Sequence, residues 1–587
     1  MEEKEIEFNE KQKMYRHSMS HILAKAIKEL YPNVLVAIGP AIDNGFYYDF
    51  DNLSLNADDF ARIEDKMKEI INKNEDFKRV EVSRDEALKL FKDEPYKTEL
   101  IKELPKDEKI TVYYTGDDFY DLCRGPHVEN TKFLRGFAFK INRVSGAYWR
   151  GSEKNKMLTR VYVYGFLNKD DLKECLRLEE EAKERDHRKL GKELGIFMYS
   201  ELVGRGLPIW LPKGFTVRRQ LSDYIMNKEI ALGYQHVMTP SLGNVNLYKT
   251  SGHWDHYKED MFPAMELDEE AYVLRPMNCP HHMMIYKNFM HSYRDLPLRL
   301  AEIANDFRYE ASGNLCGLER TRAFTQNDSH IFCRPDQIKS EVEGVIKLIL
   351  EVYKDFGFKN YEFRLSLRDV NNKEKYFGND ELWEKSESAL REILKASGAK
   401  YYEAEGEAAF YGPKIDVQVR SAIGHDITLS TIQLDYQLPE RFELEYIDAE
   451  GNKKRPVVIH RAVFGSLDRT LAFILEETKG ALPVWLSPVQ VKIVTVSEKN
   501  LGHANDVKKL LQDRGFRVEL DATNESISKK IRFATKDKVP YVLVIGDREC
   551  ADLTVSVRER GSNDTYAIDL TGFITKLTNK CEHRELN

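Results

Sequence analysis

Six residues whose side chains could contact a ligand lie at every second position within two stretches of the segment 300–333, LAEIANDFRYEASGNLCGLERTRAFTQNDSHIFC. They combine a guanidinium, two carboxylates, an aromatic ring, an amide and an imidazole: Arg308, Glu310, Phe324, Gln326, Asp328 and His330. Side chains two apart in a strand point to the same face. Burying such polar groups as ordinary core is costly, so the pattern favours a binding surface, with a solvated sheet face as the alternative.

Two further pairs carry imidazole and thiol groups at i, i+4 spacing, His17 with His21 and Cys123 with His127. The two histidines fall on one face of a helix that periodicity predicts over residues 15–30. The four side chains together could supply zinc ligands. Alternatively, the imidazoles could hold a water molecule and move protons near neutral pH. The sequence HSMSH lacks the glutamate of an H-E-x-x-H metalloprotease motif.

The elements around these residues are predicted as follows. Residues 300–333 alternate like two strands, and a polar, glycine-containing connection over residues 311–319 separates them, which predicts an antiparallel hairpin whose first strand includes Arg308 and Glu310. A helix over 215–232 precedes a strand over 235–242, and a strand after residue 456 meets an apolar helix at Gly465. From residue 487 onward the pattern predicts a βαβαββ order.

Length and composition restrict the classes of protein. A chain of 587 residues suggests about three or four domains. With 42% hydrophobic and 32% charged residues it is globular, and its net charge of −8 restricts any nucleic-acid contact to local basic surfaces. No secretory signal and no apolar run of roughly 18 residues is visible. Seven scattered cysteines indicate reduced thiols or metal ligands.

Phosphate-binding glycine motifs are missing from the sequence. It contains neither G-x-x-x-x-G-K-[ST] nor a G-x-G-x-x-G between a strand and a helix. If ATP is a substrate, arginines and metal ions must hold its phosphates.

Several motifs together resemble a known family. FRYE followed by RTRAFTQNDSHIF is similar to the second signature motif of class II aminoacyl-tRNA synthetases, in its threonyl-tRNA synthetase form. The helix–strand pair over 215–242 and the segment VIHRAVFGSLDRTLAFILEE resemble the first and third motifs. AIGPAIDNGFYYD and DLCRGPHV resemble the editing domain of bacterial-type members. Many members begin with an additional small β-rich domain, which we expect this chain to lack.

The resemblance implies a mixed α+β multidomain fold. We expect an α+β editing domain over 1–168, a charged helical linker over 169–194, a class II catalytic core with an antiparallel sheet over 195–485, and an α/β anticodon-binding domain over 486–587. It also implies a cytoplasmic homodimeric ligase of protein biosynthesis. Such an enzyme converts threonine and ATP to threonyl-adenylate, charges tRNA(Thr) and hydrolyses mischarged seryl-tRNA(Thr). The alternative hypotheses are an RNA-binding regulator without catalysis and a stand-alone proofreading hydrolase.

The family's site residues carry over to matching positions. Zinc would be held by Cys279, His330 and His460, although spacing alone would also allow His281 and His282. The residues implied in catalysis are Arg308, Glu310, Gln326 and Arg469. ATP, with Mg²⁺, would contact Arg308, Glu310, Arg320, Phe324, Gln433 and Arg469. Threonine would contact Met277, Gln326, Asp328 and Tyr411. Editing would use Tyr48, Lys97, Asp121 and the pairs His17 with His21 and Cys123 with His127. Anticodon bases would meet Asn524, Arg532, Glu549 and Arg558.

The implied zinc and the implied editing site explain each other. An apolar pocket separates isosteres such as threonine and valine only about 100-fold, whereas a metal that coordinates the amino and hydroxyl groups rejects valine. Serine keeps the hydroxyl and is smaller, so a second, hydrolytic site must remove it. Three protein ligands leave tetrahedral zinc the open position that such a role needs.

Overall fold

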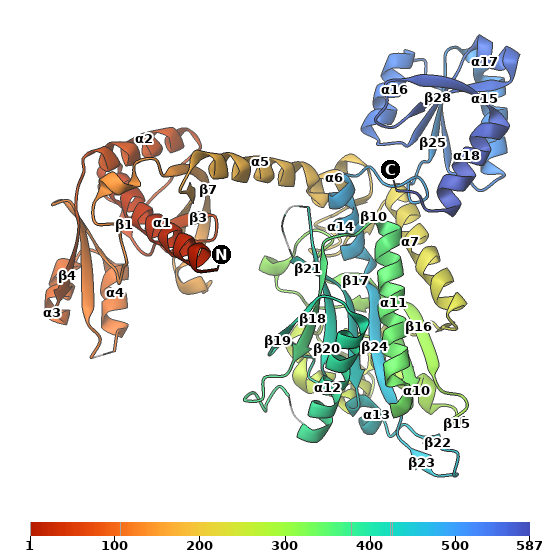
Figure 1. The fold of residues 1–587 in the computed structure, drawn as a ribbon, viewed down its shortest axis with the longest axis horizontal. Helices are drawn as coiled ribbons and strands as arrows, with labels where there is room; N and C mark the ends of the chain where they lie inside the picture. The colour runs from red at the N-terminus through yellow and green to blue at the C-terminus, as the bar shows by residue number, and fades with distance from the viewer. Residues whose placement is uncertain (1, 106, 377–378, 423, 425, 587) are drawn as a thin grey trace. The chain divides into compact units, whose positions relative to one another are not determined.

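The computed structural model describes residues 2–586 except 106, 377, 378, 423 and 425. The chain divides into two units, Met1–Glu180 and Glu181–Asn587 (Figure 1). Among the described residues, no helix has the length and apolar character needed to cross a membrane.

The first unit is built around the long helix α1 (Glu2–Leu30), which packs with α2 (Asp58–Asn72) on an antiparallel sheet. Ile22, Ala26 and Leu23 are fully buried in this helix, because residues three and four apart share its core face. The helix starts well before residue 15, the predicted start. The sheet consists of β1 (Leu35–Val36), β2 (Ala41–Ile42), β3 (Gly45–Asp51), β7 (Ala138–Tyr148) and β8 (Met157–Phe166).

A second, smaller sheet completes this unit. It consists of β4 (Phe77–Val82), β5 (Ile110–Thr115) and β6 (Phe119–Leu122) in antiparallel order, accompanied by α3 (Arg84–Leu90) and α4 (Pro95–Glu103). Val112, Phe91 and Ile101 form the small core between this sheet and its helices.

The charged run over 169–194 is helical, as predicted, and forms two helices. The helix α5 (Lys169–Arg185) has no buried side chain, as expected of a charged connector. Asp186 then leaves helical geometry, and its carboxylate accepts a hydrogen bond from Arg188 N at 2.8 Å. This N-cap starts α6 (His187–Glu193) and explains the break.

The second unit contains an eight-stranded sheet in the order β11-β16-β17-β24-β21-β20-β18-β19. The helices α7 (Pro212–Ala231), α11 (Ile338–Phe356) and α14 (Leu467–Thr478) share one core with it, so its opposite face is left for the site. The strands are β11 (Gln235–His236), β16 (Leu298–Phe307), β17 (Ala323–Cys333), β18 (Tyr361–Leu367), β19 (Tyr401–Glu405), β20 (Lys414–Arg420), β21 (Asp426–Asp435) and β24 (Val457–Ser466).

The predicted antiparallel hairpin is confirmed as β16 and β17, but its first strand is shorter than expected. β16 ends at Phe307, and Arg308 and Glu310 lie in the connection that follows. Their backbone leaves the ladder because Glu310 N bonds to Arg308 O at 2.9 Å, which makes a turn. The strand predicted over 235–242 is likewise reduced to β11, which runs parallel to β16.

The C-terminal sheet has five strands in the order β26-β25-β27-β28-β29. The six elements of the predicted βαβαββ order are confirmed, but the prediction omitted α17 (Asp547–Asp552), β29 (Thr565–Asp569) and α18 (Leu570–Glu582). The remaining elements are β25 (Val491–Thr495), α15 (Leu501–Gln512), β26 (Val518–Asp521), α16 (Ile527–Lys536), β27 (Tyr541–Ile545) and β28 (Thr554–Glu559).

Candidate functional site

Three side chains that are far apart in the sequence meet on the open face of the large sheet. His330 on β17 and His460 on β24 are direct cross-strand partners. Cys279 is the first residue of α10 (Cys279–Lys287), whose start faces the same strands. One donor atom from each of the three residues lies within 4.8 Å of the other two, and all three residues are buried. The strand register therefore brings a thiol and two imidazoles together.

The donor set fits a metal ion. His460 Nε2 lies 2.8 Å from Asp435 Oδ2, which leaves its Nδ1 for a ligand. Among the described residues, His330 Nε2 is buried without a hydrogen-bond partner. Burial, together with the charge of Asp328, raises the pKa of the Cys279 thiol, so a thiolate there requires a nearby cation. One sulfur and two nitrogens match zinc with an open fourth position.

His281 and His282, which spacing alone would allow as metal ligands, are not members of the cluster of possible ligands. His282 contacts His330, with 2.8 Å between the Nδ1 atoms of the two rings. His281 faces Tyr248, with 6.3 Å between the ring centroids. Sequence reasoning missed His253, whose Nε2 lies 3.6 Å from Cys279 Sγ.

A cavity of about 310 Å³ lies beside this cluster and is lined by charged side chains. Arg469 stands in the first turn of α14, where Ser466 Oγ caps the helix by accepting from Arg469 N at 3.2 Å. Arg320 Nε donates to Glu310 Oε2 at 2.8 Å. The predicted ATP residues that line this cavity, with Gln326, are Arg308, Glu310, Arg320, Phe324, Gln433 and Arg469.

An adjoining cavity of about 760 Å³ shares Arg308 and Gln433 with the first and includes Met277 and Tyr411. The Arg308 guanidinium lies 5.0 Å from the ring centroid of Phe324. Arg308 therefore places a positive charge on both cavities. The Tyr411 ring stacks on His460 at 5.0 Å, which ties the second cavity to the Cys279, His330 and His460 cluster.

Two further charged residues lie near the cluster and the cavities. Asp328 Oδ2 lies 3.8 Å from His330 Nε2, so this carboxylate borders the atoms that could hold a metal ion. Lys414, which the sequence reasoning did not single out, lines both cavities and pairs with Asp416 at 2.9 Å. Its position follows from the register of β20 with β21, and no local motif marks it.

A second group of possible ligands, His187, Glu319 and Glu476, has a different role. His187 Nδ1 lies 2.7 Å from Glu476 Oε1, and Leu318 N donates to His187 Nε2 at 3.1 Å. Both ring nitrogens are thus used in hydrogen bonds, so His187 links α6 to α14 and to the connection after β16.

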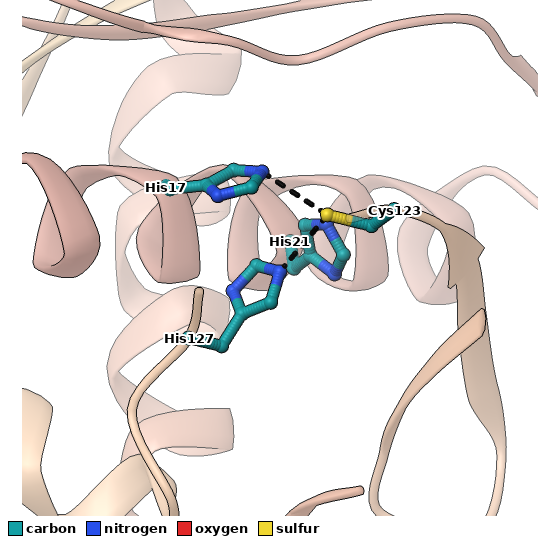
Figure 2. A group of neighbouring side chains, drawn as sticks. All are labelled: His17, His21, Cys123 and His127. Atoms are coloured by element: carbon teal, nitrogen blue, oxygen red, sulfur yellow. Dashed lines mark hydrogen bonds between the residues drawn. The ribbon is translucent and has the colours of Figure 1, made fainter. Parts of the chain in front are cut away.

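In the first unit, the predicted quartet of His17, His21, Cys123 and His127 comes together (Figure 2). The two histidines project from α1, and Cys123 and His127 from the segment after β6. Cys123 Sγ lies 3.2 Å from both His17 Nε2 and His127 Nε2. The His127 ring lies 4.3 Å from that of His17 and 4.2 Å from that of His21, measured between centroids.

Tyr48, Lys97 and Asp121 form a buried network that adjoins the quartet. Tyr48 Oη donates to Asp121 Oδ2 at 2.6 Å, and Lys97 Nζ donates to Tyr48 Oη at 3.1 Å. Lys97 also pairs directly with Asp121, which lies 3.6 Å from His21 Nε2. All seven residues predicted for this site therefore lie in one region.

Burial decides the protonation of the quartet. It lowers the pKa of His17, His21 and His127 below the usual imidazole value. Burial raises the pKa of the Cys123 thiol to about 12. At neutral pH the site therefore holds neutral imidazoles and a protonated thiol, a set suited to moving protons rather than to nucleophilic attack by sulfur.

The four C-terminal candidates lie on different elements. Asn524 is exposed after β26, and Arg532 is exposed on α16. Glu549 caps its own helix by accepting from Gly546 N at 2.9 Å. Arg558 pairs with Val542 near the start of β27, whereas Glu549 follows the end of that strand.

Three family models match the chain. The tRNA synthetase class II core domain (G, H, P, S and T) matches residues 260–478. The anticodon binding domain matches residues 490–580. The threonyl and alanyl tRNA synthetase second additional domain matches residues 110–162.

Individual relatives match over most of the chain. The threonine–tRNA ligase of Geobacillus kaustophilus is 56% identical over 566 residues, which cover 96% of this chain and 86% of the relative. That of Staphylococcus carnosus is 56% identical over 568 residues, covering 96% and 87%. A crystal structure described as the RNA binding domain of threonyl-tRNA synthetase from Cryptosporidium parvum is 40% identical with a TM-score of 0.65, covering 67% of this chain and 98% of that one.

Proposed function

Because the chain belongs to the threonyl-tRNA synthetase family, we propose that it activates threonine with ATP and transfers the threonyl group to tRNA(Thr). The observation that carries this function is the meeting of Cys279, His330 and His460 beside a cavity lined by arginines. A regulator without catalysis would have no need of such a cluster, and a stand-alone hydrolase would have no need of the large sheet.

Arg308 is assigned to the reacting groups because it borders both cavities. Its guanidinium would hold the threonine carboxylate against the α-phosphate of ATP and stabilise the charge that develops as the carboxylate attacks. Phe324 would stack beneath adenine, whose amino group would donate to Glu310. Arg320 and Arg469 would hold the γ-phosphate, and Mg²⁺ would enter with ATP.

The amino-acid pocket is assigned to the side of the cavity that adjoins His460. Cys279, His330 and His460 would hold zinc, which when bound supplies a Lewis acid for the amino and hydroxyl groups of threonine. Asp328 would accept the hydrogen bond of the threonine hydroxyl. Met277, Gln326, Tyr411 and Gln433 would form the walls. Valine would leave this polar site unsatisfied and be rejected.

The quartet in the first unit is proposed as the site that removes serine from mischarged tRNA(Thr). Neutral imidazoles at His17, His21 and His127 can take a proton from water as it attacks the ester. Lys97 and Asp121, buried and paired, would fix the orientation of His21 and the substrate. A zinc ion held by the same four residues is the alternative, because their donor atoms lie close enough together.

The remaining assignments concern partners and location. We assign anticodon reading to four residues on different elements of the C-terminal region: Asn524, Arg532, Glu549 and Arg558. A homodimer is supported by exposed apolar side chains, with Ile230 56% exposed at the end of α7 and Met238 94% exposed after β11. The seven cysteines are all free, which agrees with a reducing compartment such as the cytoplasm.

The function is tested by threonine-dependent exchange between ATP and pyrophosphate. The zinc-loaded protein is expected to catalyse exchange with threonine, and removal of zinc by a chelator is expected to abolish it. Absence of exchange in the zinc-loaded protein would refute the synthetase function.

A further inference from the structure

His282 is fully buried on α10 and lies next to the proposed zinc ligands without being one of them. Its Nδ1 lies 2.8 Å from His330 Nδ1, and the two rings meet edge to face. Its Nε2 lies 3.2 Å from Glu302 Oε2. Glu302, His282 and His330 therefore form a continuous chain of hydrogen bonds that ends at the proposed zinc ligand His330.

The first member of this chain, Glu302, is an anion. Its carboxylate accepts from Thr239 N at 3.0 Å, from Thr239 Oγ1 at 2.8 Å and from Asn278 Nδ2 at 3.2 Å, and Arg275 pairs with it at 3.2 Å. Burial alone would raise its pKa, but the hydrogen bonds from His282 and Thr239 and the charge of Arg275 lower it to about 2. A carboxylate can only accept hydrogen bonds, so His282 Nε2 must carry the proton.

The proton on His282 Nε2 determines the state of His330. A neutral imidazole has one N–H and one lone pair, so the Nδ1 of His282 is an acceptor. His330 Nδ1 must then be the donor across the 2.8 Å contact. The lone pair of His330 is consequently on Nε2, the atom that is buried without a hydrogen-bond partner among the described residues.

His460 is fixed by a shorter version of the same arrangement. Its Nε2 donates directly to Asp435 Oδ2 at 2.8 Å, so its lone pair is on Nδ1. The two ligand histidines therefore present opposite ring nitrogens. His460 needs one acceptor, whereas His330 needs a histidine in between, because Glu302 does not reach it directly.

We propose that His282 and Glu302 are positioning residues that hold His330 in the one tautomer able to bind the metal. This inference rests on the proposed function, because it requires zinc at Cys279, His330 and His460. Without the chain, His330 can place its proton on Nε2 and must give up that tautomer before it binds. Loss of such an outer partner typically weakens metal binding 10- to 100-fold.

Two amide substitutions at His282 separate the two hydrogen bonds. His282→Asn places its amide oxygen near the position of Nδ1, so an acceptor for His330 is retained. His282→Gln places its amide near the position of Nε2, so contact with Glu302 is retained and the acceptor for His330 is lost. His281→Asn is the matched control, because the neighbouring ring faces Tyr248 instead of the cluster.

Zinc affinity is measured for each full-length protein by competition with a chelator, and the visible spectrum of the cobalt-loaded protein reports the ligand geometry. The Gln variant is expected to bind zinc about 10- to 100-fold more weakly than the wild type, with an altered cobalt spectrum. The Asn variant and the His281 control are expected to stay within about threefold of the wild type. His282→Phe, which keeps a ring and removes both hydrogen bonds, replaces the Gln variant if the latter does not fold.

Equal zinc affinity in the Gln (or Phe) and Asn variants, or weaker binding by the Asn variant, would overturn this inference. Failure of the wild type to bind zinc would instead overturn the proposed zinc site itself. The two failures are therefore distinguishable, and neither depends on an activity assay.

Discussion

Replacement of His17 and His21 by alanine is expected to disable serine removal and leave threonine activation intact. The two imidazoles stand one turn apart on α1, and each lies within 4.3 Å of the His127 ring, measured between centroids. Since burial keeps all three rings neutral, each is able to act as a base. A single substitution therefore leaves two candidates in place.

The size of the effect follows from this redundancy. A positioned general base contributes about 10²- to 10⁴-fold, so the double variant, in which only His127 remains, should lose up to that factor in the rate constant of deacylation. Each single variant should lose much less, and the loss in the double variant should exceed the sum of the two single losses, because in each single variant the other histidine can still accept the proton.

The assay is hydrolysis of preformed seryl-tRNA(Thr), with threonine-dependent exchange as an internal control. Exchange should be unchanged, because both histidines belong to the unit Met1–Glu180. Glu10→Ala with Lys11→Ala, two exposed residues of the same helix, is the matched control. A chelator that abolished wild-type deacylation would favour the zinc alternative. Unchanged deacylation in the double variant would refute the site.

Three further predictions concern pH dependence, substrate selection and stability. The base is the neutral imidazole, and burial lowers the pKa of His17 and His21 below 6.5. The rate of enzymatic deacylation should therefore be constant from about pH 8 down to pH 6.5 and fall only as the pH drops through the lowered pKa. An inflection above pH 6.5 would contradict this prediction. Asp328→Ala should lower kcat/KM for threonine in the exchange assay roughly 10- to 100-fold, since a hydrogen bond to a charged group contributes about 1.5–3 kcal/mol. The value of kcat/KM for valine should not change. An equal loss for both amino acids would argue against the assigned role. Glu229 and Arg461 are both fully buried and lie 2.6 Å apart. Either Glu229→Met or Arg461→Met alone should lower the free energy of unfolding of their unit by about 3–5 kcal/mol, and the double variant should lose less than the sum. Additive losses in denaturant unfolding would show that the pair is not coupled.

Local spacing was sufficient to predict groups that share one element. The alternation of Gln326, Asp328 and His330 predicted a common strand face, and β17 provides it. The i, i+4 spacing of His17 and His21 predicted one helix face, and both rings join the quartet. These predictions succeeded because a strand repeats every two residues and a helix every 3.6.

Residues joined by strand register were beyond local reasoning. Cys279, His330 and His460 were grouped only through family resemblance, since their meeting requires β17 to lie beside β24 with His330 opposite His460. Glu302 and Asp435 carry no local signal for their contacts with histidines. The end of β16 was misjudged for a similar reason, because a turn at Arg308 and Glu310 replaces the alternation that their sequence suggests.

The C-terminal elements were missed because their patterns are weak. α17 spans Asp547–Asp552 and has no buried residue, so it gives no periodic signal. In α18 only Phe573 and Leu577 are buried. The strand β29 is an edge strand of the sheet, so its side chains show no alternation between buried and exposed.

The most direct measurement is X-ray absorption at the zinc edge of the zinc-loaded protein, with and without threonine. The expected first shell contains one sulfur at about 2.3 Å and two imidazole nitrogens at about 2.0–2.1 Å, plus light atoms that change when threonine, but not valine, is added. A closed shell of four protein ligands that threonine leaves unchanged would contradict the assignment of Cys279, His330 and His460 as the site that selects the substrate hydroxyl.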